Sequence, residues 1–332
     1  MRNRTSWIAV SAAALVTVAL TGCGTVLNNS ADEEDFPSDT ITLTVGQGAG
    51  GSTDLIAREI ARGTSGALGV PVNVENSPGA NGAIATLNVM QQEATGYELV
   101  LLNASLLTVT PLVVSEDEEV SLDDLDVIMG LSQDDYIMVA DSNSDYSTFD
   151  ELVASGDRVS TATPGIGTAG QLAQTLVTSE AGVDVNDIPY DSGGPAITAV
   201  MGGHVDLATV QVGEAMPQIE AGTVEPLLVF SDDRNEFLPD VPTAAEEGYT
   251  VPVAQYRAVA APEGTPESVQ QELRAAIEET LETEEYREFN ENNYLTPVEI
   301  SGDEVEEQWN EMAALYEELV EQNEIHLGGD RE

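Results

Sequence analysis

Two glycine-rich segments of this chain have the spacing of an anion-binding turn. Residues 46–51 and 165–170 both fit the pattern Gly-x-Gly-x-x-Gly, and each lies between a predicted strand and a predicted helix. Glycine lets the backbone approach a ligand closely, and the unpaired amides and dipole at a helix start favour a negative group by about 0.3–1 kcal/mol. Because each of two similar α/β units carries one such segment, we expect each to hold one end of a small acid in a shared cleft.

The same spacing also occurs in dinucleotide-binding enzymes. Glu75 ends the second predicted strand, about where an acid that binds the ribose of NAD would lie. This alternative leaves the second glycine-rich segment without a role, and the chain offers few groups for hydride chemistry. We therefore keep a dinucleotide-binding enzyme as the weaker alternative.

Other catalytic arrangements have little support in the sequence. The two histidines, His204 and His326, are not near a Gly-x-Ser-x-Gly segment, which many hydrolases use to present their nucleophile. The single cysteine, Cys23, lies close to the N-terminus, so no cluster of Cys and His ligands is available for a metal. The sequence therefore predicts no catalytic residue, no metal and no cofactor.

The composition is strongly acidic. Of 332 residues, 60 are Asp or Glu and 10 are Lys or Arg, for a formal net charge of −50, and all ten cations are arginines. Binding to nucleic acid or to an anionic membrane surface needs clustered cations, so both classes are excluded. With 42% hydrophobic residues the chain can still bury cores, and its length predicts about two domains. An acidic surface without lysine predicts a halophilic protein, with an ordinary acidic protein as the alternative.

The N-terminus has the pattern of an export signal. Arg2 and Arg4 precede an apolar run at 7–20, which is too short for a comfortable membrane span. Residues 20–23, Leu-Thr-Gly-Cys, resemble the lipobox of exported lipoproteins, in which the cysteine receives a diacylglyceryl anchor. We predict a signal peptide at 1–22, a lipid anchor on Cys23 and a flexible tether at 23–39, which places the protein on the outer face of the cytoplasmic membrane. An ordinary cleaved signal with an incidental cysteine is the alternative.

The body of the chain predicts an α/β fold with two similar units. In the first unit, strands at 40–45, 70–75 and 98–103 alternate with helices at about 52–66 and 82–92, an order typical of a parallel sheet. Strands are also expected at 127–131 and 136–140, after which the pattern restarts with strands at 158–163, 187–190 and 205–210 and helices at 171–180 and 195–201. A strand at 227–230 and two amphipathic helices, one after Pro266 and one with its apolar stripe from Val305 to Leu319, complete the chain. We expect one lobe to comprise 40–130 with 228–332, and the other 131–227.

Several segments in order resemble one known family. The first glycine-rich segment is followed by Asp54, Arg58 and the run Val74-Glu75-Asn76-Ser77-Pro78-Gly79-Ala80-Asn81-Gly82, and further matching segments lie at 165–168, 188–190, 193–195, 202–206, 221–222, 238–243 and 261–266. Over 41–309 this resembles the solute receptors of tripartite tricarboxylate transporters, the Bug family.

The resemblance implies a two-lobed, periplasmic-binding-protein-like fold of the flytrap type, with mixed, mostly parallel sheets. It implies a monomeric extracytoplasmic receptor that captures a small di- or tricarboxylate and delivers it to membrane permease subunits, without catalysis. A carboxylate-sensing partner of a membrane sensor kinase is an alternative. Carried onto this chain, the family's carboxylate-binding loops are Gln47, Gly48, Ala49, Gly50 and Gly51, and Gly165, Ile166, Gly167, Thr168 and Ala169, with Tyr190 and Gly193 nearby.

Three further polar residues are candidates from their own positions. Asp54 either meets a ligand amine or pairs with Arg58 four residues later on the same helix. Asn103 follows the third strand, where it either bonds a carboxylate or begins a turn. Gln211 also follows a predicted strand, at the sheet edge where ligands of α/β proteins gather.

Overall fold

The computed structural model describes residues 36–115 and 118–328. The predicted signal peptide, Cys23 and most of the predicted tether lie outside the described residues. The end of the tether segment is packed on the body: the Phe36 ring lies 5.2 Å from the ring of Tyr97, and the Ser38 N–H donates to the Tyr97 hydroxyl at 3.0 Å. In the described part of the chain, no helix is long and apolar enough to cross a membrane.

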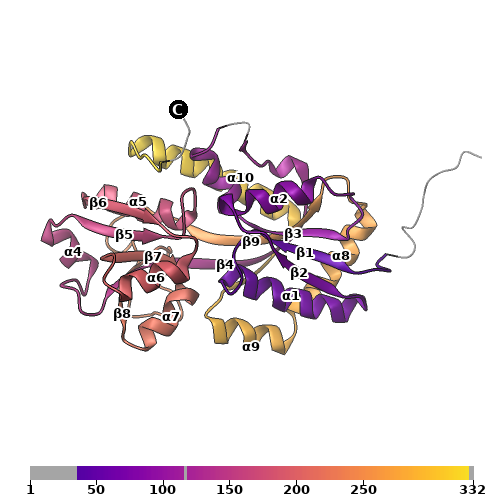
Figure 1. Cartoon of the computed structure of the whole chain (residues 1–332), viewed down its shortest axis with the longest axis horizontal. Coiled ribbons are helices and arrows are strands. Elements are labelled where there is room, and N and C mark those ends of the chain that lie inside the picture. The colour runs from indigo at the N-terminus through magenta and orange to yellow at the C-terminus, as the bar shows by residue number, and fades with distance from the viewer. Residues whose placement is uncertain (1–35, 116–117, 329–332) are drawn as a thin grey trace, which may run out of the picture. The chain divides into compact units, whose positions relative to one another are not determined.

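The described strands form one mixed sheet with the order β2-β1-β3-β9-β4-β7-β5-β6, in which β8 and β10 pair with β4 (Figure 1). In its first half, three parallel strands lie beside an antiparallel one: β1 (Ile41–Val45), β2 (Val72–Asn76), β3 (Glu98–Asn103) and β9 (Ala254–Pro262). The second half contains β5 (Val159–Thr163), β6 (Val185–Pro189), β7 (Leu207–Gln211) and β8 (Val224–Val229). In it β5 pairs in parallel with β6 and β7, and both β7 and β8 pair antiparallel with β4.

A single long strand, β4 (Leu125–Asp141), joins the two halves. Its residues 125–135 pair with β9, and residues 136–141 pair with β7 and β8. The sequence predicted two strands here, because polar residues such as Ser132 and Asp134 interrupt the apolar pattern. Both side chains are buried and bonded to another buried residue, Arg257, so the strand continues through them. The strand β9, which the sequence analysis missed, and β10 (Pro297–Ser301) are antiparallel to β4 and make the sheet mixed.

Helices cover both faces of each half. In the first half, α1 (Ser52–Leu68) and α8 (Glu267–Leu281) pack on one face through Ile56, Ile60 and Leu273, with α9 (Glu284–Asn293) beside them. The other face is covered by α2 (Ala83–Met90), and the short α3 (Ser105–Thr108) joins the same apolar cluster. In the second half, α4 (Phe149–Ser155) and α5 (Ala169–Ala181) pack on one face, and α6 (Gly193–Met201) and α7 (Val212–Glu220) on the other.

The last helix, α10 (Gly302–Gln322), belongs to both halves. Val305 and Trp309 are buried in the first half with Val100 and Leu102, whereas Tyr316 and Leu319 are buried in the second half. Figure 1 shows the helix lying across the junction of the two halves. The apolar stripe that the sequence identified is therefore core, and it packs on both halves rather than on the first alone.

The start of α10 is a tight contact that a small substitution tests. A Cβ added at Gly302 would lie 1.8 Å from the carbonyl oxygen of Val127 in β4, and backbone cannot move aside cheaply. We expect Gly302→Ala to lower the free energy of unfolding by about 2 kcal/mol or more in denaturant titrations. The control is Gly66→Ala in α1, where a Cβ would meet no atom within 4 Å; it should leave stability unchanged or raise it by about 0.5–1 kcal/mol. Equal effects of the two substitutions would contradict the packing described here.

Candidate functional site

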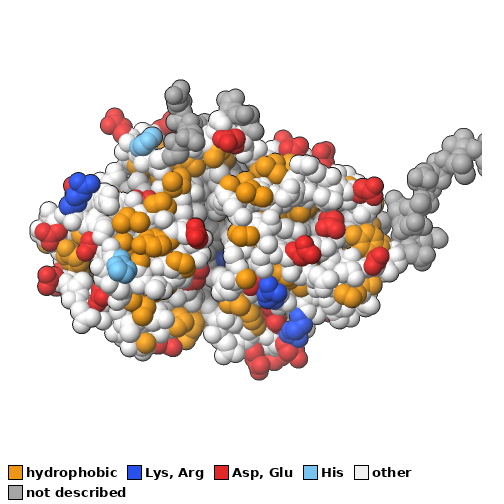
Figure 2. All heavy atoms as spheres, viewed as in Figure 1, with side chains coloured by type: hydrophobic (Ala, Val, Ile, Leu, Met, Phe, Trp, Pro, Cys, Tyr) orange, Lys and Arg blue, Asp and Glu red, His pale blue; other side chains and the backbone are white. Residues whose placement is uncertain are grey.

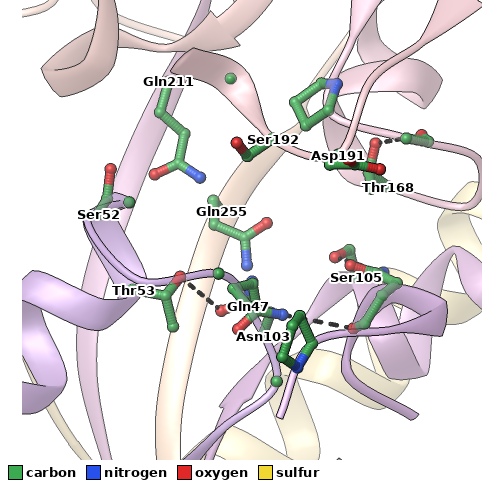
Figure 3. Close-up of a pocket in the computed structure, with 18 of the residues that line it drawn as sticks. Gln47, Ser52, Thr53, Asn103, Ser105, Thr168, Asp191, Ser192, Gln211 and Gln255 are labelled. Carbon is green, nitrogen blue, oxygen red and sulfur yellow. Dashed lines mark hydrogen bonds between the residues drawn. The ribbon is translucent and has the colours of Figure 1, made fainter. Parts of the chain in front are cut away.

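A cavity of about 670 Å³ lies between the two halves of the sheet. It opens where β1, β3, β5, β6 and β7 end, the edge at which α/β proteins bind ligands. Figure 2 shows the surface hollowed along the junction of the halves, and Figure 3 shows polar side chains from both halves around the cavity. The first half contributes Gly46, Gln47, Gly48, Gly51, Ser52, Thr53, Pro78, Gly79, Ala80, Asn81, Asn103 and Ser105. The second half and the joining strands contribute Tyr136, Pro164, Gly165, Ile166, Thr168, Tyr190, Asp191, Ser192, Gly193, Gln211, Glu214 and Gln255.

The sequence-predicted residues divide into two groups in this structure. Ten line the cavity: Gln47, Gly48, Gly51, Asn103, Gly165, Ile166, Thr168, Tyr190, Gly193 and Gln211. Five do not: Ala49, Gly50, Asp54, Gly167 and Ala169. The hydrogen bonds of the two glycine-rich segments explain most of this division.

Asp54 closes the first glycine-rich turn. Its carboxylate accepts from the Gly50 N–H at 2.8 Å and from Asn76 Nδ2 at 2.9 Å, and it forms an ion pair with Arg58 at 2.8 Å. Burial would raise the pKa of Asp54, but the hydrogen bonds from Arg58, Gly50 and Asn76 lower it below its usual value. The carboxylate is therefore ionised and fully engaged, which agrees with the helix-pair interpretation rather than with a contact to a ligand amine.

The second glycine-rich segment docks on the first half of the molecule. The Gly167 N–H donates to Gln171 Oε1 at 2.9 Å, and its carbonyl accepts from Asn81 Nδ2 and Thr110 Oγ1, both at 3.1 Å. Thr168 caps α5 by accepting from the Gln171 N–H at 3.3 Å. The Gly167 N–H is thus used within the protein, and neither Gly167 nor Ala169 lines the cavity, whereas Gly165, Ile166 and Thr168 do.

Two other helix starts present amides to the cavity. In the described structure no side chain caps the first turn of α1 after Gly51 or that of α6 after Ser192, and both starts line the cavity. Uncapped N–H groups at a helix start attract an anion. Each half therefore presents one helix start without a side-chain cap to the cavity, α1 in the first half and α6 in the second, whereas Thr168 caps α5.

Arg257, which the sequence analysis missed, lies behind the cavity in β9 and is 1% exposed. It forms an ion pair with Asp134 of β4 and donates to Thr53 Oγ1 at 2.9 Å, Ser132 Oγ at 2.9 Å and Gln211 Oε1 at 2.5 Å. These partners come from both halves. The available signal was a single arginine within the apolar run at 251–262, which indicates a buried charge that needs partners.

These bonds orient two amide side chains in the cavity wall. Because the Gln211 oxygen accepts from Arg257, its NH₂ group is turned to the cavity, as Figure 3 shows. Thr53 accepts from Arg257 and donates its hydroxyl hydrogen to Asn103 Oδ1 at 3.2 Å, so the Asn103 NH₂ group is also free to donate. Arg257 thus fixes one amide donor in each half without lining the cavity itself.

Charges in the wall are negative. Of the lining residues, all within the described part of the chain, Asp191 and Glu214 are the charged ones. Glu214, also missed, lies in the first turn of α7, and its Oε2 atom is buried without a hydrogen-bond partner among the described residues. Burial raises the pKa of Glu214 to about 7, although Arg257 and the Gln211 N–H oppose the rise. No motif or spacing in the sequence distinguishes Glu214 from the rest of the 60 acidic residues.

Arg257→Met tests the network behind the cavity. Removing the guanidinium leaves Asp134 buried without its ion-pair partner, so we expect a loss of about 3–5 kcal/mol in the free energy of unfolding. The control is Arg234→Met, whose ion pair with Glu246 is 43–46% exposed and should contribute less than about 1 kcal/mol. A loss for Arg257→Met no larger than for Arg234→Met would show that the network is dispensable.

Glu214 gives a pH dependence of stability with a defined sign. Because the pKa is raised to about 7 from 4.5, the folded protein holds this proton more tightly than the unfolded chain does. The free energy of unfolding should therefore fall by up to about 3 kcal/mol on this account as pH rises from 4.5 to 8. Glu214→Gln should remove that part of the decrease, measured by denaturant titration at fixed ionic strength. If wild type and variant show parallel pH profiles, the carboxyl is not desolvated.

Comparison with known proteins gives one consistent family. A family model described as tripartite tricarboxylate transporter family receptor matches residues 56–325. The chain is similar to protein BugT of Bordetella pertussis, with 31% identity over 86% of this chain and 89% of BugT. Its fold is similar to that of the periplasmic binding protein BugD, with a TM-score of 0.80 and 27% identity over 88% of this chain and 99% of BugD. It is also similar in fold to MatC from Rhodopseudomonas palustris with bound malate, with a TM-score of 0.78 and 24% identity over 86% of this chain and 100% of MatC. The predicted two-lobed α/β binding-protein fold is thereby confirmed.

Proposed function

Because the chain belongs to the receptor family of tripartite tricarboxylate transporters, we propose that it captures a small di- or tricarboxylate outside the cell and delivers it to the permease subunits of such a transporter. One observation carries the proposal: the uncapped starts of α1 and α6, one from each half, line a single cavity. The amide groups of Asn103 and Gln211 add one donor from each half. A carboxylate needs such donors, and dipoles can supply them where the wall carries no cation.

The proposed mechanism is capture without chemistry. A carboxylate that contacts both helix starts is bound more tightly when the halves are close together, so ligand binding favours the closed form. The sequence predicts lobes of 40–130 with 228–332 and of 131–227. Because Phe230 and Val251 pack in the core of the second half, we propose that the second lobe extends beyond residue 250 and that β4 and β9 join the two lobes.

The placement of the receptor in the cell is also a proposal. Export by the signal at 1–22, a lipid anchor on Cys23 and a monomeric body fit a receptor that meets its permease at the membrane surface. With a net charge of −50, the protein repels an anionic ligand at long range. In molar salt the screening length falls to about 3 Å, so this repulsion acts only over short distances. We therefore propose that it works in a saline environment.

A thermal unfolding screen tests the proposed function. The mature protein, in molar KCl, is mixed with mono-, di- and tricarboxylates, and a carboxylate ligand at 100 times its dissociation constant should stabilise the fold by about 2.7 kcal/mol. That corresponds to a midpoint increase of roughly 5 °C. NAD and butane-1,4-diamine serve as controls. NAD is larger than a small carboxylate, and the diamine is of similar size but carries positive charge, so neither should shift the midpoint. A shift with NAD alone would favour the dinucleotide alternative, and no shift with any carboxylate would contradict the proposal.

A further inference from the structure

The turn before α2 has an unusual backbone conformation. The φ angles of Gly79, Ala80, Asn81 and Gly82 are 146°, 47°, 52° and 99°, and two of these four residues carry a side chain. Alanine and asparagine adopt such angles at a cost in free energy, which the surrounding contacts must offset. The conformation therefore points to a role for a side chain of this turn, and Asn81 is the polar one.

The turn is fixed to the first half of the molecule. A Cβ added at Gly46 would lie 2.4 Å from the Gly82 Cα atom, so the first glycine-rich segment and the turn approach each other as closely as two glycines allow. Gln47 Nε2 also lies 3.5 Å from the Asn81 carbonyl oxygen. The backbone of the turn therefore moves together with the first glycine-rich segment.

The side chain of Asn81 reaches the second half. Its Nδ2 atom lies 3.1 Å from the carbonyl oxygen of Gly167, in the second glycine-rich segment, and 3.0 Å from both Ser105 Oγ and Thr110 Oγ1. Because a carbonyl oxygen can only accept, the group that faces Gly167 must be the NH₂ group. Its two hydrogens are shared by three acceptors of the protein, so they are already used although Asn81 lines the cavity.

The second glycine-rich segment offers Gly167 as a fixed acceptor. A Cβ at Gly167 would lie 2.8 Å from Val113 Cγ2, so a side chain here would prevent the close approach. The Gly167 N–H donates to Gln171 Oε1 at 2.9 Å. Gln171 is 4% exposed, and its Nε2 atom donates to Asp187 Oδ2 at 2.9 Å and to the Leu327 carbonyl at 3.0 Å. Gly167 is thus held in place from its own half, and its carbonyl points to Asn81.

These contacts join the two glycine-rich segments through protein atoms alone. When the halves separate, Gly167 leaves Asn81, whereas the backbone of the turn stays with the first half. A hydrogen bond that exists in the closed form alone shifts the equilibrium toward that form. We propose that Asn81 is a positioning residue that holds the halves together before a ligand arrives. The inference goes beyond the proposed function, because it concerns the protein without a ligand.

Spin labels on the two halves test this inference. The full chain with Cys23→Ser is labelled at Asn88→Cys in α2 and Thr198→Cys in α6, two exposed positions. Double electron–electron resonance in molar KCl, without any added acid, gives the distribution of distances between the labels. With Asn81 intact, we expect most molecules at the distance that the structure gives for these two positions.

Two substitutions of Asn81 remove the donor and keep the turn. Glycine adopts positive φ freely, so Asn81→Gly should lower the ratio of closed to open protein by about threefold to tenfold, the effect of one hydrogen bond. Asn81→Asp keeps the shape of the side chain but places acceptors against the Gly167 carbonyl, so it should open the protein further. Asparagine and aspartate both tolerate the left-handed conformation, and circular dichroism verifies that each variant is folded.

The control is Asn143→Gly, a change of the same kind within the second half. The Asn143 amide donates to Asp141 Oδ1 at 2.9 Å in an exposed turn, so its loss should leave the distances between the labels unchanged. The inference is overturned if the protein with Asn81 intact is mostly open, or if Asn81→Gly and Asn81→Asp both give its distance distribution. Either result would leave the proposed function standing, because the capture of an acid is measured separately.

Discussion

Arg257 and Asp134 form a buried ion pair at the centre of the sheet, where β9 and β4 pass from one half to the other. A buried pair is stable only when its remaining donors and acceptors are bonded, and here the additional partners are Thr53 from α1 and Gln211 from β7. The same bonds turn amide groups of both halves toward the cavity. The orientation of the cavity wall thus follows from the requirement to satisfy one buried charge.

An acidic protein that binds an acid must attract it over short distances only. The cavity wall has helix starts and amide side chains as donors, and the arginine behind it is neutralised by Asp134. Such dipoles act within a few ångströms, so they are little affected by the net charge of −50 when salt screens the surface.

The sequence predicted the elements whose signals are local. The glycine cluster before α1 and the alternation of β1 are complete within a few residues, so both were found near their observed positions. The docking of the second glycine-rich segment could not be predicted, because the Gly167 N–H donates to Gln171 and the Gly167 carbonyl accepts from Asn81 and Thr110, contacts that no local pattern shows. The strand β9, Arg257 and Glu214 were missed because their roles depend on partners up to 204 residues away in the chain.

The central claim is that a carboxylate binds between the halves at the starts of α1 and α6. The most direct measurement is a crystal structure of the protein with the acid that stabilises it most. The account predicts carboxylate oxygens within hydrogen-bonding distance of N–H groups at both of these helix starts, with Gln211 as a further donor. A carboxylate bound instead at the start of α5, or at a site contacted by one half only, would contradict it.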